Sequence, residues 1–171
     1  ARGYMAGRTV GNSTNGAATG FAGGSYGGFG SDGGANSYMG VSAAPANMVY
    51  GDFRDPNEPG SGAGRLGAGG GLVRITAGIL ELDGLIAADG QYAGYYSGGG
   101  SGGGIRLDVG VLSGEGLIRS RGGAAYPSDQ LAGGGGGRIA IRYEELIGFD
   151  LTSCVHVGGG DGTGALDGSS G

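Results

Sequence analysis

One pattern of residues occurs three times along the chain. In the first two copies Gly78 corresponds to Gly110 at an offset of 32 residues, and the neighbouring positions keep the same offset. The copies open with the glycine runs 69–71, 102–104 and, more loosely, 133–137. A fixed period is typical of chains built from stacked supersecondary units, so this repeat constrains the fold more than any other feature.

Each copy reads as short β-strands. Apolar residues stand two apart, with polar or small residues between them, which is the period of a half-buried strand. The pairs are Val73 and Ile75, Ile105 and Leu107, and Ile139 and Ile141. Frequent glycine disfavours long helices, at about 1 kcal/mol per residue relative to alanine. The sequence predicts one helical turn, over residues 143–147, and a short strand over residues 154–157.

Glycine makes up 49 of the 171 residues, against a usual level of about 7%. Collagen is excluded because glycine does not recur at every third position and there are only four prolines. The sequence predicts an all-β fold, with a Gly-rich parallel β-helix or β-solenoid of about three copies over residues 61–171. The alternative is a polyglycine-II bundle flanked by small β-sheets. Residues 1–60, rich in Gly, Tyr and Pro, are predicted to form an irregular opening region or an atypical first coil.

Charge and composition exclude several classes of function. The net charge is −5 and all ten basic residues are arginine, so the basic stripe that binds nucleic acid is missing. No apolar run approaches the roughly 20 residues of a membrane span. The start without Met suggests a processed product or a segment of a longer protein, and the sequon at Asn12 fits secretion. The single cysteine, Cys154, excludes an internal disulfide framework and leaves an intermolecular disulfide as a hypothesis.

Few side chains suggest chemistry. The only histidine, His156, is expected to face outward from its strand and to share that face with Cys154, a spacing that does not by itself activate a thiolate. Asp52, Asp55 and Glu58 supply oxygen ligands suited to calcium, but an acidic surface turn is the favoured interpretation. Arginines and carboxylates in matching copies are expected to pair across strands. The sequence therefore predicts no catalytic, cofactor-binding or metal-binding residue, and a chain that is not an enzyme.

Tyrosine is the most suggestive of the remaining residues. Tyr92, Tyr95 and Tyr96 stand between two copies. They either cap the coil edges or form an amphipathic contact surface for carbohydrate or for a neighbouring subunit.

The order of several blocks resembles the glycine-rich repeat modules of very large surface or secreted proteins. The blocks are residues 23–28, 49–52, 59–62, 69–75, 98–107 and 133–141. The resemblance implies an extracellular, β-helix-like module with a structural or adhesive role, and it implies no catalytic residue. With no polar cap evident at either end, we expect a subunit or segment of a filament, sheath or adhesin that self-associates by stacking. The alternatives are a carbohydrate-binding surface module and a polysaccharide-acting enzyme.

Overall fold

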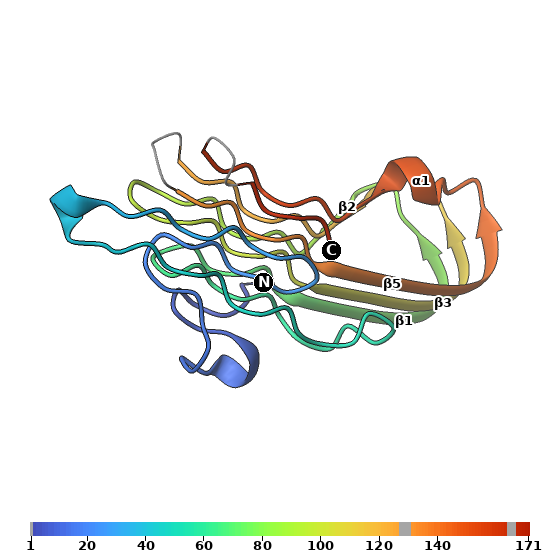
Figure 1. Cartoon of the computed structure of the whole chain (residues 1–171). Coiled ribbons are helices and arrows are strands. Elements are labelled where there is room, and N and C mark those ends of the chain that lie inside the picture. The colour runs from blue at the N-terminus through green and yellow to red at the C-terminus, as the bar shows by residue number, and fades with distance from the viewer. Residues whose placement is uncertain (1, 127–130, 164–166) are drawn as a thin grey trace.

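The computed structural model describes residues 2–126, 131–163 and 167–171. It contains two three-stranded parallel sheets (Figure 1). The first sheet has the order β1 (Leu72–Glu81), β3 (Gly104–Ser113) and β5 (Arg138–Ile147), and the second has the order β2 (Leu85–Ala87), β4 (Leu117–Arg119) and β6 (Val155–His156). The helical segments are short: η1 (Val10–Asn12), η2 (Ser37–Met39) and α1 (Leu151–Cys154). The predicted all-β class is confirmed.

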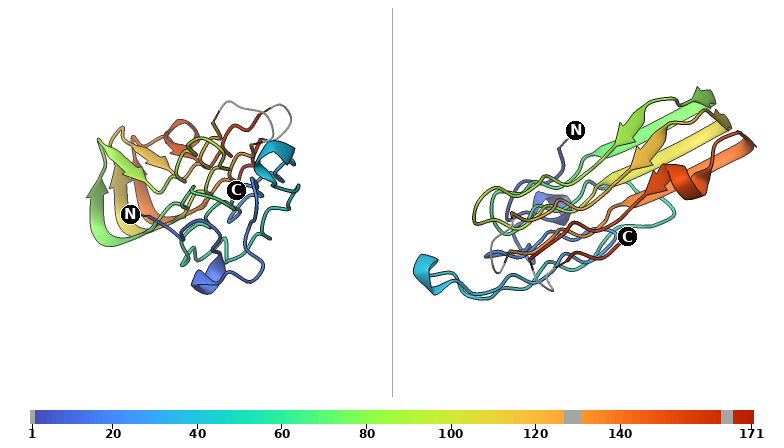
Figure 2. Two further views of the ribbon diagram at one scale, coloured as in Figure 1. Left: turned by 90° about the vertical axis from the view of Figure 1, so that its left-hand side faces the viewer. Right: turned by 90° about the horizontal axis from the view of Figure 1, so that it is seen from above.

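The strand register follows the sequence repeat. Val73 lies opposite Ile105, which in turn lies opposite Ile139, and Gly104 continues the same register next to Leu72. Figure 2 shows the strands of the three copies as successive parallel layers. The predicted alternation and the predicted stacking of like residues are thus confirmed within the sheets.

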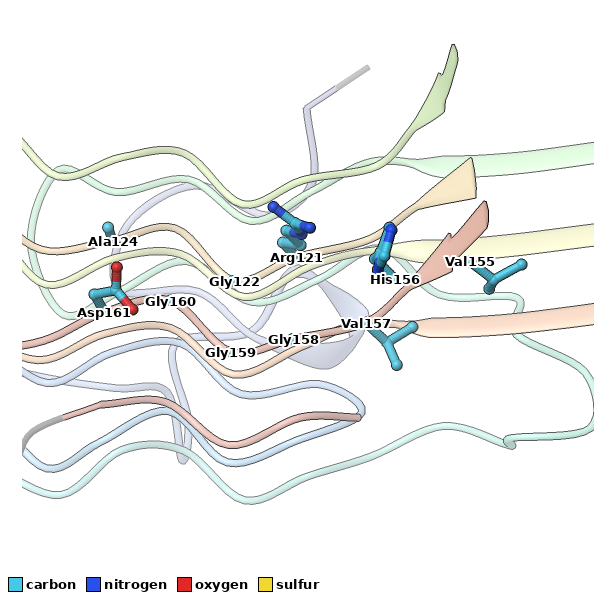
Figure 3. A pocket seen from close by; sticks show the side chains of 10 residues that line it. All are labelled: Arg121, Gly122, Ala124, Val155, His156, Val157, Gly158, Gly159, Gly160 and Asp161. Carbon is cyan, nitrogen blue, oxygen red and sulfur yellow. The ribbon is translucent and has the colours of Figure 1, made fainter. Parts of the chain in front are cut away.

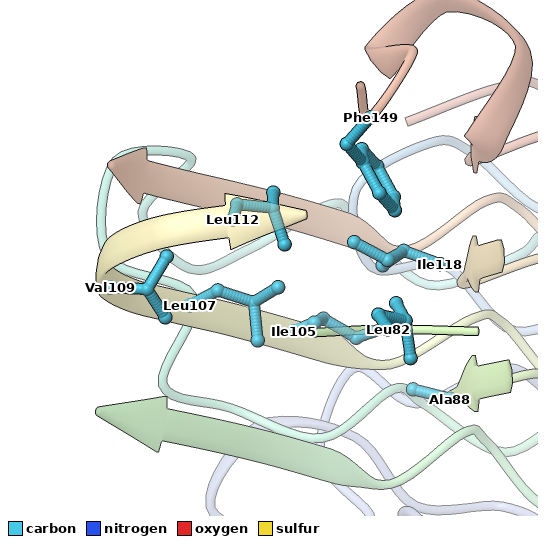
Figure 4. Close-up of a cluster of buried hydrophobic side chains, with 8 residues drawn as sticks. All are labelled: Leu82, Ala88, Ile105, Leu107, Val109, Leu112, Ile118 and Phe149. Atoms are coloured by element: carbon cyan, nitrogen blue, oxygen red, sulfur yellow. The ribbon is translucent and has the colours of Figure 1, made fainter. Parts of the chain in front are cut away.

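The apolar core lies between the two sheets and is centred on the middle copy (Figure 4). Ile105, Leu107, Leu112 and Ile118 are fully buried. Burying a side chain of this kind stabilises the fold by about 1.5–3 kcal/mol. The middle copy is the best buried because β3 and β4 have a neighbouring strand on both sides, whereas β1, β2, β5 and β6 have one on a single side.

The third copy departs from the sequence prediction. Residues 143–147 belong to β5, so the helical turn predicted there is wrong: pairing with β3 outweighs the local helical preference. The helical turn follows instead, in α1, where the side chain of Asp150 accepts a hydrogen bond from the N–H of Thr152. Cys154 ends α1 and is not part of β6, so the prediction that it shares a strand face with His156 is also wrong.

Beyond the sheets the chain forms a glycine-rich bundle, defined here by residues 22–31, 60–71, 88–91, 98–104, 120–123, 132–137, 157–160 and 168–171. Its central tract, 98–104, hydrogen-bonds to three neighbouring segments in turn. The backbone N–H groups of residues 99–103 donate in order to the backbone carbonyls of Ala132, Gln91, Ser61, Gly135 and Ala88. Every third residue therefore returns to the same neighbour, unlike a β-strand, in which the period is two.

Glycine is required in this bundle by close backbone contacts. A Cβ atom added at Gly134 would lie 2.1 Å from the carbonyl oxygen of Gly100, and one added at Gly100 would lie 2.0 Å from that of Ala68. Any other residue would force the chains apart and break their hydrogen bonds.

The described part of residues 1–60 contributes to the same bundle. The N–H of Gly24 donates to Gly99, and the carbonyl of Gly24 accepts from Gly135. Nearby, the buried amide of Asn47 bonds both backbone groups of Ser25 and donates to the hydroxyl of Ser61. This network joins segments distant in sequence, while the division of the chain at residue 60 stays a prediction.

Candidate functional site

An ionic cluster covers the outer face of the first sheet. Asp55, from the segment 50–58, contacts Arg106 and lies 3.4 Å from Arg74. Asp108 bonds Arg106 at 2.6 Å and Arg142 at 3.4 Å. The Arg106 guanidinium holds the pKa of Asp108 below its usual range. The Asp108–Arg142 pair between β3 and β5 confirms the expected cross-strand pairing of arginines and carboxylates, and the Asp55 pairs tie the segment 50–58 to the sheet.

The structure does not bring the three candidate calcium ligands together. The Asp52 side chain accepts from the N–H of Arg54, the Asp55 carboxylate contacts arginines, and Glu58 accepts from the hydroxyl of Tyr4 at 2.6 Å. Within the described ranges, no group of three or more His, Cys, Asp or Glu side chains is placed to hold a metal ion. These geometries favour the acidic surface turn.

His156 lies in a shallow groove of about 480 Å³ along β6 and the glycine segment that follows it (Figure 3). Its ring points to the same side as Arg121 and away from Val155 and Val157, so its predicted outward direction is confirmed. Asp161 stands at the far end of the groove. The thiol of Cys154 is free, and its predicted intermolecular disulfide stays a prediction.

The two ends of the sheet stack differ. At the first copy, β1 and β2 present their free edges, with Ile79 72% and Leu85 53% exposed. At the third copy, Phe149 is buried against the core, and α1 follows it with its polar residues outward. The expectation that the terminal glycine-rich segments have no polar cap stays a prediction. Sequence reasoning did not predict α1, and the signal for it is Asp150, a helix-capping residue directly after an aromatic one.

A tyrosine cluster (Tyr92, Tyr95, Tyr96 and Tyr126) lies on the loops that connect the glycine tracts. The rings of Tyr95 and Tyr126 have centroids 4.0 Å apart, and those of Tyr95 and Tyr96 are 6.1 Å apart. The Tyr126 hydroxyl donates to that of Tyr95 at 2.6 Å, and this bond raises the pKa of Tyr126. The sequence placed three of these rings between two copies but did not predict the contact of Tyr95 with Tyr126.

Among the described residues, no helix has the length and the apolar character needed to cross a membrane. Comparisons of the chain with protein-family models, with curated proteins and with solved structures find no match.

Proposed function

We propose that this chain is a non-enzymatic structural module of an extracellular assembly, such as a filament, a sheath or an adhesin. In this proposal, neighbouring copies join edge to edge, with β1 of one copy beside β5 of the next. The observation that carries the proposal is the parallel order β1-β3-β5, in which, among the described residues, both outer strands lack a strand neighbour on one side. Unpaired strand edges are templates for pairing with another chain.

We further infer that the sheets follow β-solenoid order and that the glycine-rich bundle packs as polyglycine II. The three-residue period of its hydrogen bonds supports this inference, because polyproline-II-type helices have three residues per turn. Such a bundle is held largely by hydrogen bonds between backbone groups. That construction suits a stiff, repetitive element of an assembly.

The free edge of β1 can be assigned residue by residue. The N–H of Gly104 donates to the carbonyl of Gly71, and hydrogen bonding in a parallel strand alternates between its two sides. Before Gly78, odd-numbered positions such as Ile75 therefore point their backbone groups toward β3, and Thr76 points its own toward the free edge. The side chain of Thr76 is exposed on the outer face.

The cap at the third copy restricts how two copies can meet. Because Phe149 and α1 cover the interior beside β5 and β6, a joint at this end relies on strand edges more than on apolar burial. Edge pairing without a large apolar interface predicts association that depends strongly on protein concentration.

The test compares Thr76→Pro with Thr76→Ala. Proline at this position removes only an N–H that has no partner in the single copy, so the fold is kept while edge pairing is blocked. We expect the wild-type chain and Thr76→Ala to form oligomers or fibres with rising concentration, in light scattering and negative-stain electron microscopy. Thr76→Pro should stay monomeric with a similar melting temperature. A wild-type chain that is monomeric at millimolar concentration would overturn the proposal.

A further inference from the structure

The loop 92–96, which carries three residues of the tyrosine cluster, lies at the end of the bundle far from the sheets (Figure 1), so the cluster takes no part in the proposed strand-edge contact. Its rings are open to solvent: Tyr92, Tyr95 and Tyr96 are 52%, 64% and 42% exposed. Such large aromatic side chains normally contribute to a fold by being buried. In the tyrosine cluster much of the ring surface stays exposed, so this contribution to folding is largely not made.

The backbone at Tyr96 adds a second observation. Its φ is 61°, in the left-handed region, where a bulky aromatic residue is an outlier. At most of the other positions with a positive φ the chain has glycine, as at Gly114 and Gly148. Glycine at position 96 would relieve this conformational cost, at the loss of the contact with the mostly exposed ring of Tyr95. The local backbone therefore does not explain why tyrosine stands at this turn.

We propose that the tyrosine cluster binds a neutral carbohydrate. The exposed faces of the rings suit the C–H faces of pyranose sugars, and the phenol groups suit sugar hydroxyls. The hydroxyl of Tyr126 donates to that of Tyr95, so the proton of the Tyr95 hydroxyl is left to bond a ligand acceptor. The contact between the rings of Tyr95 and Tyr126 holds this part of the surface in place.

The size of the cluster favours a sugar over a protein partner. Fully exposed aromatic side chains offer about 200 Å² each, so three rings at these exposures present on the order of 300 Å². A standard protein interface buries about 800 Å² on each partner. A surface of the smaller size matches two or three sugar units.

The experiment titrates the whole chain with four neutral hexasaccharides, made of β-linked glucose, xylose, mannose or N-acetylglucosamine. Polygalacturonate serves as an anionic comparator, and binding is followed by calorimetry and by saturation-transfer NMR. We expect at least one neutral hexasaccharide to bind. Tyr95→Ala should weaken that binding about tenfold or more, because it removes the central ring of the cluster. Tyr38→Ala is the matched control, because this tyrosine ring is also exposed, at 95%, but lies on η2 and does not belong to the tyrosine cluster.

Tyr96→Gly separates binding from folding. It should raise the melting temperature, because glycine adopts the left-handed turn without strain, and it should weaken sugar binding. The proposal is overturned if no neutral hexasaccharide binds, or if Tyr95→Ala binds as the wild type does. Binding of polygalacturonate alone would also overturn it and would point to the groove of Arg121 and His156. Neither Tyr95→Ala nor Tyr96→Gly touches β1, so failure here is distinguishable from failure of strand-edge assembly.

Discussion

The sheet region and the glycine-rich bundle fill their interiors with different parts of the chain. Between the sheets the interior consists of side chains such as Leu107 and Leu112, which are fully buried. In the bundle it consists largely of backbone, with segments such as 98–104 bonded to three neighbours. The first arrangement depends on apolar burial and the second on hydrogen bonds that are each worth about 0.5–1.5 kcal/mol net.

This difference shows why both regions occur in one chain. Glycine loses more backbone entropy on ordering than any other residue, so a bundle of free glycine tracts would be poorly stable. Here three of the tracts run directly into strands: residues 60–71 lead into β1, residues 98–104 into β3, and residues 132–137 into β5. The sheets therefore align the tracts, and the register of the apolar residues sets the register of the glycines.

The two regions should respond to opposite kinds of substitution, and the largest effect is expected in the bundle. In Gly134→Ala the new Cβ would lie 2.1 Å from the carbonyl oxygen of Gly100. We expect a loss of at least about 3 kcal/mol of unfolding free energy, since the clash is with backbone that cannot rotate away. The control is Gly94→Ala, where an added Cβ meets nothing within 4 Å. Urea unfolding followed by circular dichroism measures both, and equal stability of the two variants would refute the tight packing of the bundle.

In the sheet region the damaging substitution replaces a large buried side chain with a small one. Leu112→Ala opens a cavity in the fully buried core and should cost about 2–5 kcal/mol. Ile79→Ala, on the same sheet but at a side chain 72% exposed, should change stability by less than about 0.5 kcal/mol. The same unfolding assay checks the pair. A small effect of Leu112→Ala would mean that the bundle, and not the apolar core, holds the sheets together.

The same contrast explains what the sequence could and could not predict. In the sheets, side chains carry the information: the offset between Gly78 and Gly110 predicts the observed parallel register. In the bundle the tracts are nearly free of side chains, so no pattern indicates that Gly24 lies beside Gly99. The outward direction of His156 followed from strand alternation, but its position beside Arg121 depends on how two tracts pack.

The third copy shows a further limit, because local signals there compete with pairing. Residues 143–147 have a helical preference of their own, but β3 pairs with them as a strand. The helix forms a few residues later, where Asp150 caps it and Phe149 closes the core. Local propensity is a weak predictor where a preformed edge strand is available.

The smallest predicted effect uses acid to separate the two regions. The pKa of Asp108 is lowered in the fold because Arg106 bonds its carboxylate. Because the pKa of Asp108 is lower in the folded chain than in the unfolded chain, its ionised form stabilises the fold at pH values above the unfolded-state pKa. This contribution is lost as the pH falls through the folded-state pKa. Below about pH 4, therefore, the ionic cluster should weaken. The backbone hydrogen bonds of residues 98–104 in the bundle do not titrate in this range and should be unchanged.

Hydrogen exchange of backbone amides at pH 5 and pH 2.5, corrected for intrinsic rates, tests this difference. We expect protection to fall for residues 50–58, which the cluster ties to the sheet, and to persist for residues 98–104. Asp55→Asn should give the same local loss at pH 7, because the neutral amide cannot form the ion pairs with Arg74 and Arg106. An equal loss of protection in both segments at low pH would instead mean that the bundle depends on the charged face of the sheet, so that the two regions unfold as one unit.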